Sequence, residues 1–146
     1  MIQKRLLDLP ILYLSSYILQ NKDEYYQKLS GITGTLLWKS WILYMLEAVS
    51  QTVEYTIDKI MRIKALMEKT KAVMLENKLP VGKMDIPKLF EQPYIRPKNL
   101  MSEKVKSINT AKKYLTQMES LGMLSKEKIG KEFIWFNTDL MAILTD

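Results

Sequence analysis

Residues 96–131 read RPKNLMSEKVKSINTAKKYLTQMESLGMLSKEKIGK, and this stretch decides the fold of the chain. It holds nine Lys or Arg against three acids, a net charge of +6 that equals the net charge of all 146 residues. The excess positive charge is therefore confined to about a quarter of the sequence. Clustered charge of this kind is typical of nucleic-acid-binding proteins, because neutralisation of phosphates dominates their affinity.

This stretch and the residues just before it predict three helices. Pro93 would stop one short helix, and Pro97 would open a second that is brief. Ser107 is placed to cap a third helix, which Gly122 would end in a left-handed conformation. Apolar residues of this third helix recur at three- and four-residue steps and build one face: Ile108, Ala111, Leu115, Met118 and Leu121.

Beyond the third helix, residues 124–129 and 133–137 are predicted to form two strands. The loop between them has Gly130 first and Lys131 second, which suits a tight hairpin. Three helices followed by a basic hairpin predict a winged helix-turn-helix that binds double-stranded DNA. The residues predicted to contact DNA are Arg96, Lys98, Lys106, Ser107, Asn109, Thr110, Lys112, Lys113, Thr116, Lys126, Lys128 and Lys131.

An alternative stays open, because a lysine-rich helix face is often plain solvated surface. The chemistry of the cations also matters, since only three of the 22 basic residues are Arg and none of these lies on the third helix. Lys lacks the planar fork that reads guanine through two hydrogen bonds. We therefore expect attraction to the DNA backbone rather than sharp recognition of a base sequence.

Composition excludes several kinds of site. The absence of Cys rules out disulfides and thiolate metal sites, and the absence of His removes the commonest general base and zinc ligand. We expect no catalytic site, no metal and no cofactor. The longest apolar run, residues 41–46, is far shorter than the roughly 20 residues that span a bilayer. With no recognisable cleavage site for a signal peptide, a cytoplasmic protein without a membrane partner is expected.

The first half of the chain is predicted to be helical throughout. Pro10, behind the capping residue Asp8, would open a first helix that ends at residue 20. Asn21 would cap a second helix, and Gly31 and Gly34 would break it. Aromatic residues in this half are expected to pack in a core rather than to form a ligand cage: Tyr13, Tyr17, Tyr25, Tyr26, Trp38 and Trp41.

A third helix of almost forty residues is predicted to begin at Trp38 and to end near Glu76, because no Pro or Gly interrupts its apolar period. The residues that keep this period are Ile42, Leu46, Val49, Val53, Ile57, Ile60, Met67 and Met74. So much apolar surface predicts a homodimer through residues 6–75. Residues 78–85 would be a linker, which gives two domains, residues 1–79 and 80–146.

An ordered series of segments resembles the C-terminal half of bacterial Fic proteins. The segments are LLDLPILYLS (6–15), DEYY (23–26), WKSW (38–41), LEAV (46–49), LFEQPY (89–94), TA (110–111), YL (114–115) and LGML (121–124). Fic proteins are helical enzymes that transfer adenylyl groups, and some carry a C-terminal winged helix. The resemblance therefore implies a mainly α fold: a helical Fic-like segment with a long helix, followed by a winged helix-turn-helix with a small β-hairpin.

The catalytic loop of the Fic family, His-x-Phe-x-x-Gly-Asn-Gly-Arg, would lie upstream of Leu6, and the sequence has no His. No catalytic residue of the family carries over, so the chain is expected to correspond to a Fic protein cut after its active site and not to be an enzyme. A DNA-binding regulator is the leading prediction. Two alternatives stay open: the C-terminal half of a split Fic adenylyltransferase that needs an N-terminal Fic fragment as partner, and a dimerising protein-interaction module.

Overall fold

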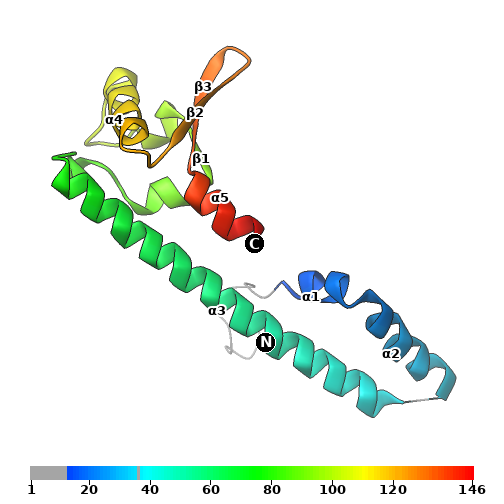
Figure 1. The fold of residues 1–146 in the computed structure, drawn as a ribbon. Coiled ribbons are helices and arrows are strands. Elements are labelled where there is room, and N and C mark those ends of the chain that lie inside the picture. Colours follow the sequence, from blue (N-terminus) through cyan, green and yellow to red (C-terminus); the bar gives the residue numbers. More distant parts are fainter. Residues whose placement is uncertain (1–12, 36) are drawn as a thin grey trace. The chain divides into compact units, whose positions relative to one another are not determined.

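The computed structural model describes residues 13–35 and 37–146, which form helices and one small antiparallel sheet (Figure 1). The predicted mainly α fold class is confirmed. The chain divides into two compact units, Met1–Ile60 and Met61–Asp146, and the division falls within the longest helix. The predicted domain boundary between residues 79 and 80 would follow this helix, and it stays a prediction.

The described part of the first unit begins with two helices that meet at Asn21. They are α1 (Leu14–Gln20) and α2 (Lys22–Thr35). The second helix begins where the sequence predicts, but Asn21 acts on the helix before it, because its side-chain Nδ2 donates to the Tyr17 carbonyl at 2.9 Å. Asp8 and Pro10, predicted to begin the first helix, lie outside the described residues.

The prediction that Gly31 and Gly34 break the second helix is wrong, since α2 continues through both. A helical Gly costs only about 1 kcal/mol relative to Ala, which the remaining residues of a 14-residue helix can offset. At Gly31 the nearest side-chain atoms to an added Cβ belong to Leu37, at 3.9 Å. That is ordinary van der Waals contact, so this position tolerates Gly and does not require it.

The long helix α3 spans Trp38–Glu76, as predicted. In the first unit it buries one face through Tyr44, Ala48 and Thr52, which lie one turn apart. The Thr52 hydroxyl donates to the Ala48 carbonyl at 2.6 Å, which satisfies this buried polar group within the helix itself.

Aromatic rings pack around Tyr44. Its ring centroid lies 5.9 Å from that of Tyr17, 6.4 Å from that of Tyr25 and 6.1 Å from that of Trp41. The predicted aromatic packing is confirmed for these three partners of Tyr44. It is wrong for Tyr13 and Trp38, which are more than half exposed. Tyr26 is also more than half exposed, but its ring packs edge-on against that of Tyr25, with centroids 5.3 Å apart.

In the second unit, the segment after α3 is packed rather than extended. It contains three 3₁₀ turns and a short strand, namely η2 (Val81–Lys83), η3 (Pro87–Phe90), β1 (Tyr94–Ile95) and η4 (Pro97–Leu100). The prediction of a linker at residues 78–85 is corrected, because Leu79 and Met84 are buried in the core. Pro80 and Gly82 turn the chain without preventing their apolar neighbours from packing. The two short helices predicted around Pro93 and Pro97 are the turns η3 and η4.

The predicted third helix and hairpin are confirmed as α4 (Ile108–Ser120), β2 (Ser125–Ile129) and β3 (Glu132–Phe136). Gly122 follows the end of α4 with φ +73°, and Gly130 opens the two-residue hairpin loop with φ +63°, both in the left-handed region. Ser107 stands at the N-cap position of α4, but its side chain makes no capping hydrogen bond.

Two elements of the second unit were not predicted. β1 pairs antiparallel with β3, so the sheet order is β1-β3-β2. A last helix, α5 (Thr138–Thr145), begins at Asn137, whose Oδ1 accepts from the Leu140 N–H at 3.0 Å. Asn137 was assigned to the end of the second strand, and it is instead the cap of this helix.

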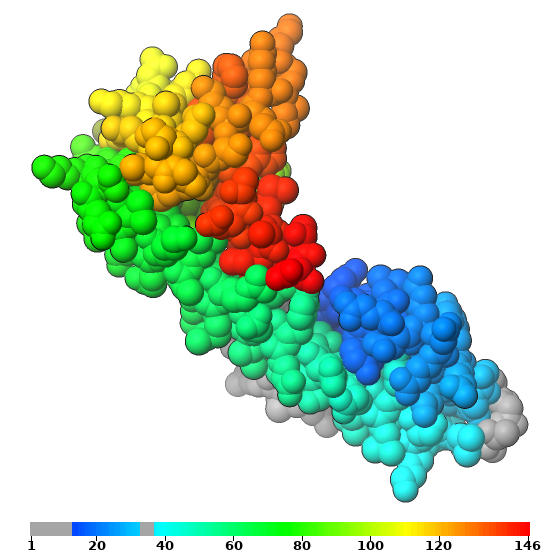
Figure 2. All heavy atoms as spheres, viewed as in Figure 1, coloured from blue at the N-terminus to red at the C-terminus, as the bar shows by residue number. Residues whose placement is uncertain are grey.

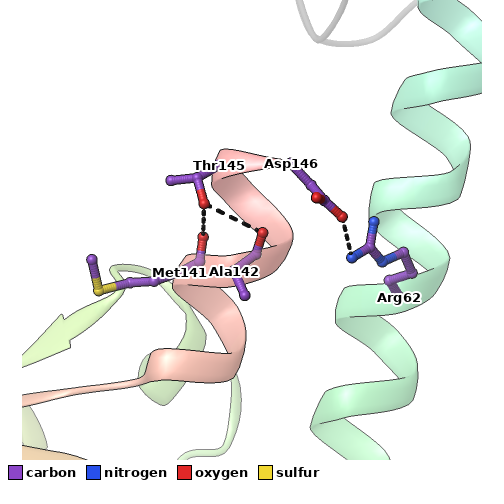
Figure 3. Close-up of polar contacts among 5 residues, drawn as sticks. All are labelled: Arg62, Met141, Ala142, Thr145 and Asp146. Carbon is purple, nitrogen blue, oxygen red and sulfur yellow. Dashed lines mark hydrogen bonds and ion pairs between the residues drawn. The ribbon is translucent and has the colours of Figure 1, made fainter.

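One core holds these elements together. It joins Met74 of α3 to Leu89, Leu115 of α4 and Trp135 of β3, each at most 2% exposed. At the end of α5, Arg62 of α3 donates from Nη2 to Asp146 Oδ2 at 2.8 Å (Figure 3). Both side chains are at least 41% exposed, so this ion pair adds only about 0–1 kcal/mol to the free energy of unfolding.

Candidate nucleic-acid interface

A basic groove opens between η4, the start of α4 and the tip of the β2–β3 hairpin. It has a volume of about 440 Å³ and is lined by Arg96, Pro97, Lys98, Ile108, Lys112, Lys131, Glu132 and Phe133. Figure 2 shows α4 (yellow) and the hairpin (orange) side by side on the face in view. Four cations from three separate elements thus line one groove, together with a single carboxylate.

Local contacts position Arg96 at one side of the groove. Its backbone N–H donates to Asn99 Oδ1 at 3.0 Å, which closes the η4 turn. Its guanidinium Nε lies 3.7 Å from Glu132 Oε2, and the two side chains are 53% and 67% exposed. A pair this exposed is weak and easily exchanged, so Arg96 can turn to a stronger anion such as a phosphate.

The outer face of α4 is polar. Asn109, Lys112, Lys113 and Thr116 are exposed along it, while Thr110 is half-buried at its edge. Because no side chain caps the start of α4, its first backbone N–H groups have no capping partner there. Free N–H groups and the positive end of the helix dipole favour anions at this end.

A buried tryptophan of the hairpin forms a hydrogen bond with α4. The indole Nε1 of Trp135 donates to Glu119 Oε2 of α4 at 3.2 Å. Lys126 pairs across the strands with Trp135, and Lys128 pairs with Phe133, so all four side chains share one face of the sheet. The Lys126 ammonium lies 4.4 Å from the centroid of the Phe133 ring. The basic face of the hairpin is therefore the face that adjoins α4.

A family model described as "Protein adenylyltransferase SoFic-like, C-terminal domain" matches residues 66–140, about half of the chain. The chain belongs to this family. The predicted resemblance to Fic proteins is thereby confirmed. The matched part of the SoFic-like C-terminal domain runs from within α3 into α5, and it contains every residue of the basic groove. No helix that the structure describes combines the length and apolarity needed to cross a bilayer.

In the SoFic-like domain, the predicted DNA-contacting residues fall into two sets. Four line the basic groove: Arg96, Lys98, Lys112 and Lys131. The others lie outside it, before α4, along α4 or on β2: Lys106, Ser107, Asn109, Thr110, Lys113, Thr116, Lys126 and Lys128. Lys104, part of the same charge excess, points elsewhere, since its Nζ donates to the Gly82 carbonyl at 3.1 Å. DNA contact by these residues stays a prediction.

Two apolar residues of the groove were missed by the sequence reasoning. Ile108 was expected on the buried face of the third helix, and this is wrong, since it is 47% exposed. It is the first residue of α4 and lies beyond the part of that face that the core covers. Phe133 is 45% exposed on the hairpin. The alternation of β3 could have placed Phe133 on the face of Trp135, but not shown that the hairpin extends past the core.

Proposed function

We propose that the second unit is a winged helix that binds double-stranded DNA through the polar face of α4 and the basic face of the hairpin. The observation that carries this proposal is that cations of η4, α4 and the hairpin, far apart in the sequence, line one groove. A cation on one helix is commonly solvated surface, whereas cations gathered from three elements create a local positive potential. α4 would enter the major groove and the hairpin would contact flanking phosphates.

The expected mode of binding is backbone contact with modest sequence preference. The cations of the α4 face and of the hairpin are all Lys, which binds phosphates as a point charge. Asn109 and Thr116 offer the side chains on the α4 face that could hydrogen-bond to base edges. The charge term should dominate affinity, so binding should depend strongly on salt.

A regulatory role without adenylyl transfer fits the residues of this sequence. The sequence has no His, so the base of the Fic catalytic loop is not among its 146 residues. The same fact is compatible with a split Fic enzyme, in which a separate N-terminal fragment would supply that loop. Transfer of label from ATP to an acceptor protein by the purified chain, abolished by a point change within these residues, would contradict a non-catalytic role.

The test of DNA binding is a titration of a fluorescent duplex at two salt concentrations. If about five phosphates are neutralised, a fourfold rise in salt should weaken binding by roughly 10²–10³-fold. Binding that does not respond to salt, or no binding at low salt, would contradict the proposal and favour a protein-interaction module.

A second candidate function is self-association through the first unit. Along α3 an apolar stripe is exposed, with exposed fractions of 51, 59, 55 and 39%: Ile42, Leu46, Ile57 and Ile60. Leu46, Val53 and Ile60 recur every seven residues, as in the seam of a coiled coil. We infer that a second copy of the chain covers this apolar stripe as a two-fold dimer, which would present two winged helices to one duplex.

Sedimentation equilibrium tests this dimer. The 17.1 kDa chain should sediment as a dimer at micromolar concentration, and Ile57→Glu with Ile60→Glu should make it monomeric. Because both side chains are exposed, this variant should keep its helical circular-dichroism spectrum. A folded wild-type monomer at high micromolar concentration would rule the dimer out.

A further inference from the structure

The basic groove has an apolar wall that contact with duplex phosphates does not use. Ile108 and Phe133 line the groove beside its four cations, and they are 47% and 45% exposed. A pocket of roughly 300–1,000 Å³ with apolar walls and a few convergent charges is typical of a ligand site, and this groove measures about 440 Å³. A ligand that is both planar and anionic would match this combination of an aromatic wall with cations.

The anionic part of such a ligand would lie among the cations. Arg96 presents a planar fork that can bind two phosphate oxygens, and Lys112 and Lys131 approach from α4 and the hairpin. Glu132 is the one acid in the lining, and its charge is opposed by Arg96 at 3.7 Å. Four cations against one acid leave the groove with a net charge of +3, which favours a phosphate group over a neutral sugar or base alone.

The planar part would lie against Phe133. The Lys126 ammonium, which does not line the groove, stands 4.4 Å from the centroid of this ring. A cation at that distance is attracted to the face of an aromatic ring and helps to hold the ring in place. An aromatic side chain beside a positive groove is the arrangement on which unpaired bases stack in proteins that bind single strands.

We propose that the basic groove binds one unpaired nucleotide, with its phosphate among Arg96, Lys98, Lys112 and Lys131 and its base stacked on Phe133. This goes beyond duplex binding, because the bases of an intact duplex stay stacked on one another and cannot reach Phe133. A free mononucleotide and an unpaired nucleotide at the end of a DNA strand share this chemistry, and the experiment separates the two sources.

The first arm is calorimetric titration of the full chain with deoxythymidine monophosphate, with deoxythymidine and with inorganic phosphate. The second arm compares a blunt DNA duplex with the same duplex carrying one unpaired nucleotide at its end. Tenfold tighter binding of the mononucleotide than of either half supports a free nucleotide. A gain of about tenfold from the unpaired nucleotide supports a strand end. No preference in either arm overturns the proposal.

Two variants test whether the preference for an unpaired nucleotide arises in the groove. Phe133→Ala should remove the roughly tenfold preference for an unpaired nucleotide. Ile129→Ala should keep it, because Ile129 is an apolar residue of the same hairpin that lies outside the groove and is 51% exposed, against 45% for Phe133. Should Phe133→Ala fail to fold, Phe133→Leu keeps the apolar bulk without a ring for stacking. A preference that survives the loss of the ring would contradict the proposal.

A third variant separates this proposal from the proposed function. Lys128 lies on the basic face of the hairpin but outside the groove. Lys128→Gln should weaken duplex binding and leave the preference for an unpaired nucleotide unchanged. If duplex binding itself fails, the mononucleotide arm still supports or overturns the nucleotide site.

Discussion

The two units of the chain bury their apolar side chains to very different extents. In the second unit one core runs from Met74 through Leu115 to Trp135, all at most 2% exposed. Among the described residues of the first unit, the buried apolar side chains are Tyr44 and Ala48, and the apolar stripe of α3 is exposed. The second unit therefore has an extended apolar core, whereas the first leaves the apolar stripe of α3 exposed.

The family match follows the same division. The SoFic-like C-terminal domain begins at residue 66, within the part of α3 that belongs to the second unit, and ends in α5. The segment that the family model matches is thus the segment with a closed core. The difference between the units teaches that a helix which is continuous along its backbone can belong to an apolar core at one end and keep an apolar face exposed at the other.

The largest expected effect comes from the same substitution at two leucines. Leu115→Ala, at a side chain that is 0% exposed, should lower the free energy of unfolding of the second unit by about 2–5 kcal/mol. Leu46→Ala, at a side chain that is 59% exposed, should change the free energy of unfolding of the first unit by less than about 0.5 kcal/mol. Urea unfolding followed by far-ultraviolet circular dichroism, which reports the helices of both units, measures both. A background of Trp38→Phe and Trp41→Phe lets the fluorescence of Trp135 follow the second unit separately.

The background variant with both leucines intact is the reference for this pair. Both substitutions remove the same atoms, so any difference reports the environment of the leucine rather than its chemistry. Equal losses at the two positions, measured at a concentration at which the chain is monomeric, would contradict the contrast between the units.

A smaller effect is expected from removing the hydrogen bond of a buried indole N–H in the second unit. Glu119→Ala removes the acceptor of the Trp135 indole, whose side chain is only 2% exposed. An unsatisfied buried donor costs roughly 1–3 kcal/mol, so the free energy of unfolding should fall by about that amount. Glu119→Gln keeps an acceptor oxygen and should recover most of the loss. A variant with Gln that is no more stable than the variant with Ala would show that the hydrogen bond does not hold the hairpin.

The first unit offers the opposite case. Among the described residues, the buried hydroxyl of Tyr44 has no hydrogen-bond partner. Tyr44→Phe removes this unsatisfied group, so it should leave the melting temperature unchanged or raise it by an amount that corresponds to about 1 kcal/mol. A fall in the melting temperature, measured by circular dichroism at pH 8, would indicate that the hydroxyl is bonded after all.

The Tyr44 hydroxyl should also make the stability of the chain depend on alkaline pH. Burial raises the pKa of Tyr44 above its ordinary value of 10.0, and the neighbouring Tyr17 and Glu24 add to the rise. The unfolded chain loses this proton near pH 10 while the folded chain keeps it, so the contribution of Tyr44 to stability is present below pH 10 and is lost as the pH rises further. The difference in melting temperature between pH 8 and pH 10.5 should be smaller for Tyr44→Phe than for the wild type.

The sequence predicts an element well where the signal is local. Gly122 and Gly130 adopt positive φ, and only a residue without a Cβ does so at little cost, so the end of α4 and the hairpin loop were predictable. The length of α3 followed from its unbroken apolar period. A capping residue, Asn137, followed by an acid in the first turn, Asp139, is also a local signal for a helix. The start of α5 was missed because Asn137 directly follows a strand and was assigned to that strand.

The sequence does not predict what depends on distant packing. β1 has only two residues and exists because it pairs with β3 across the sheet, which no local pattern reveals. The sequence identifies the cations of the basic groove as candidate DNA contacts. It does not show that four of them line one groove, because that depends on how η4 and the hairpin pack at the start of α4. Ile108 and Phe133 were missed for the same reason, because an apolar residue gives no sign in the sequence of whether the core reaches it.

The most direct test of DNA binding by the second unit is a matched pair of charge reversals. Lys112→Glu with Lys113→Glu changes the α4 face, and Lys69→Glu with Lys71→Glu changes two exposed lysines of α3 in the same unit by the same net charge. Anisotropy of a fluorescent duplex at low salt measures the affinity of each variant, and circular dichroism checks that each is folded. We expect the α4 variant to lose measurable binding and the α3 variant to stay within a few-fold of the wild type. Equal affinities for the two variants would contradict a DNA interface on α4.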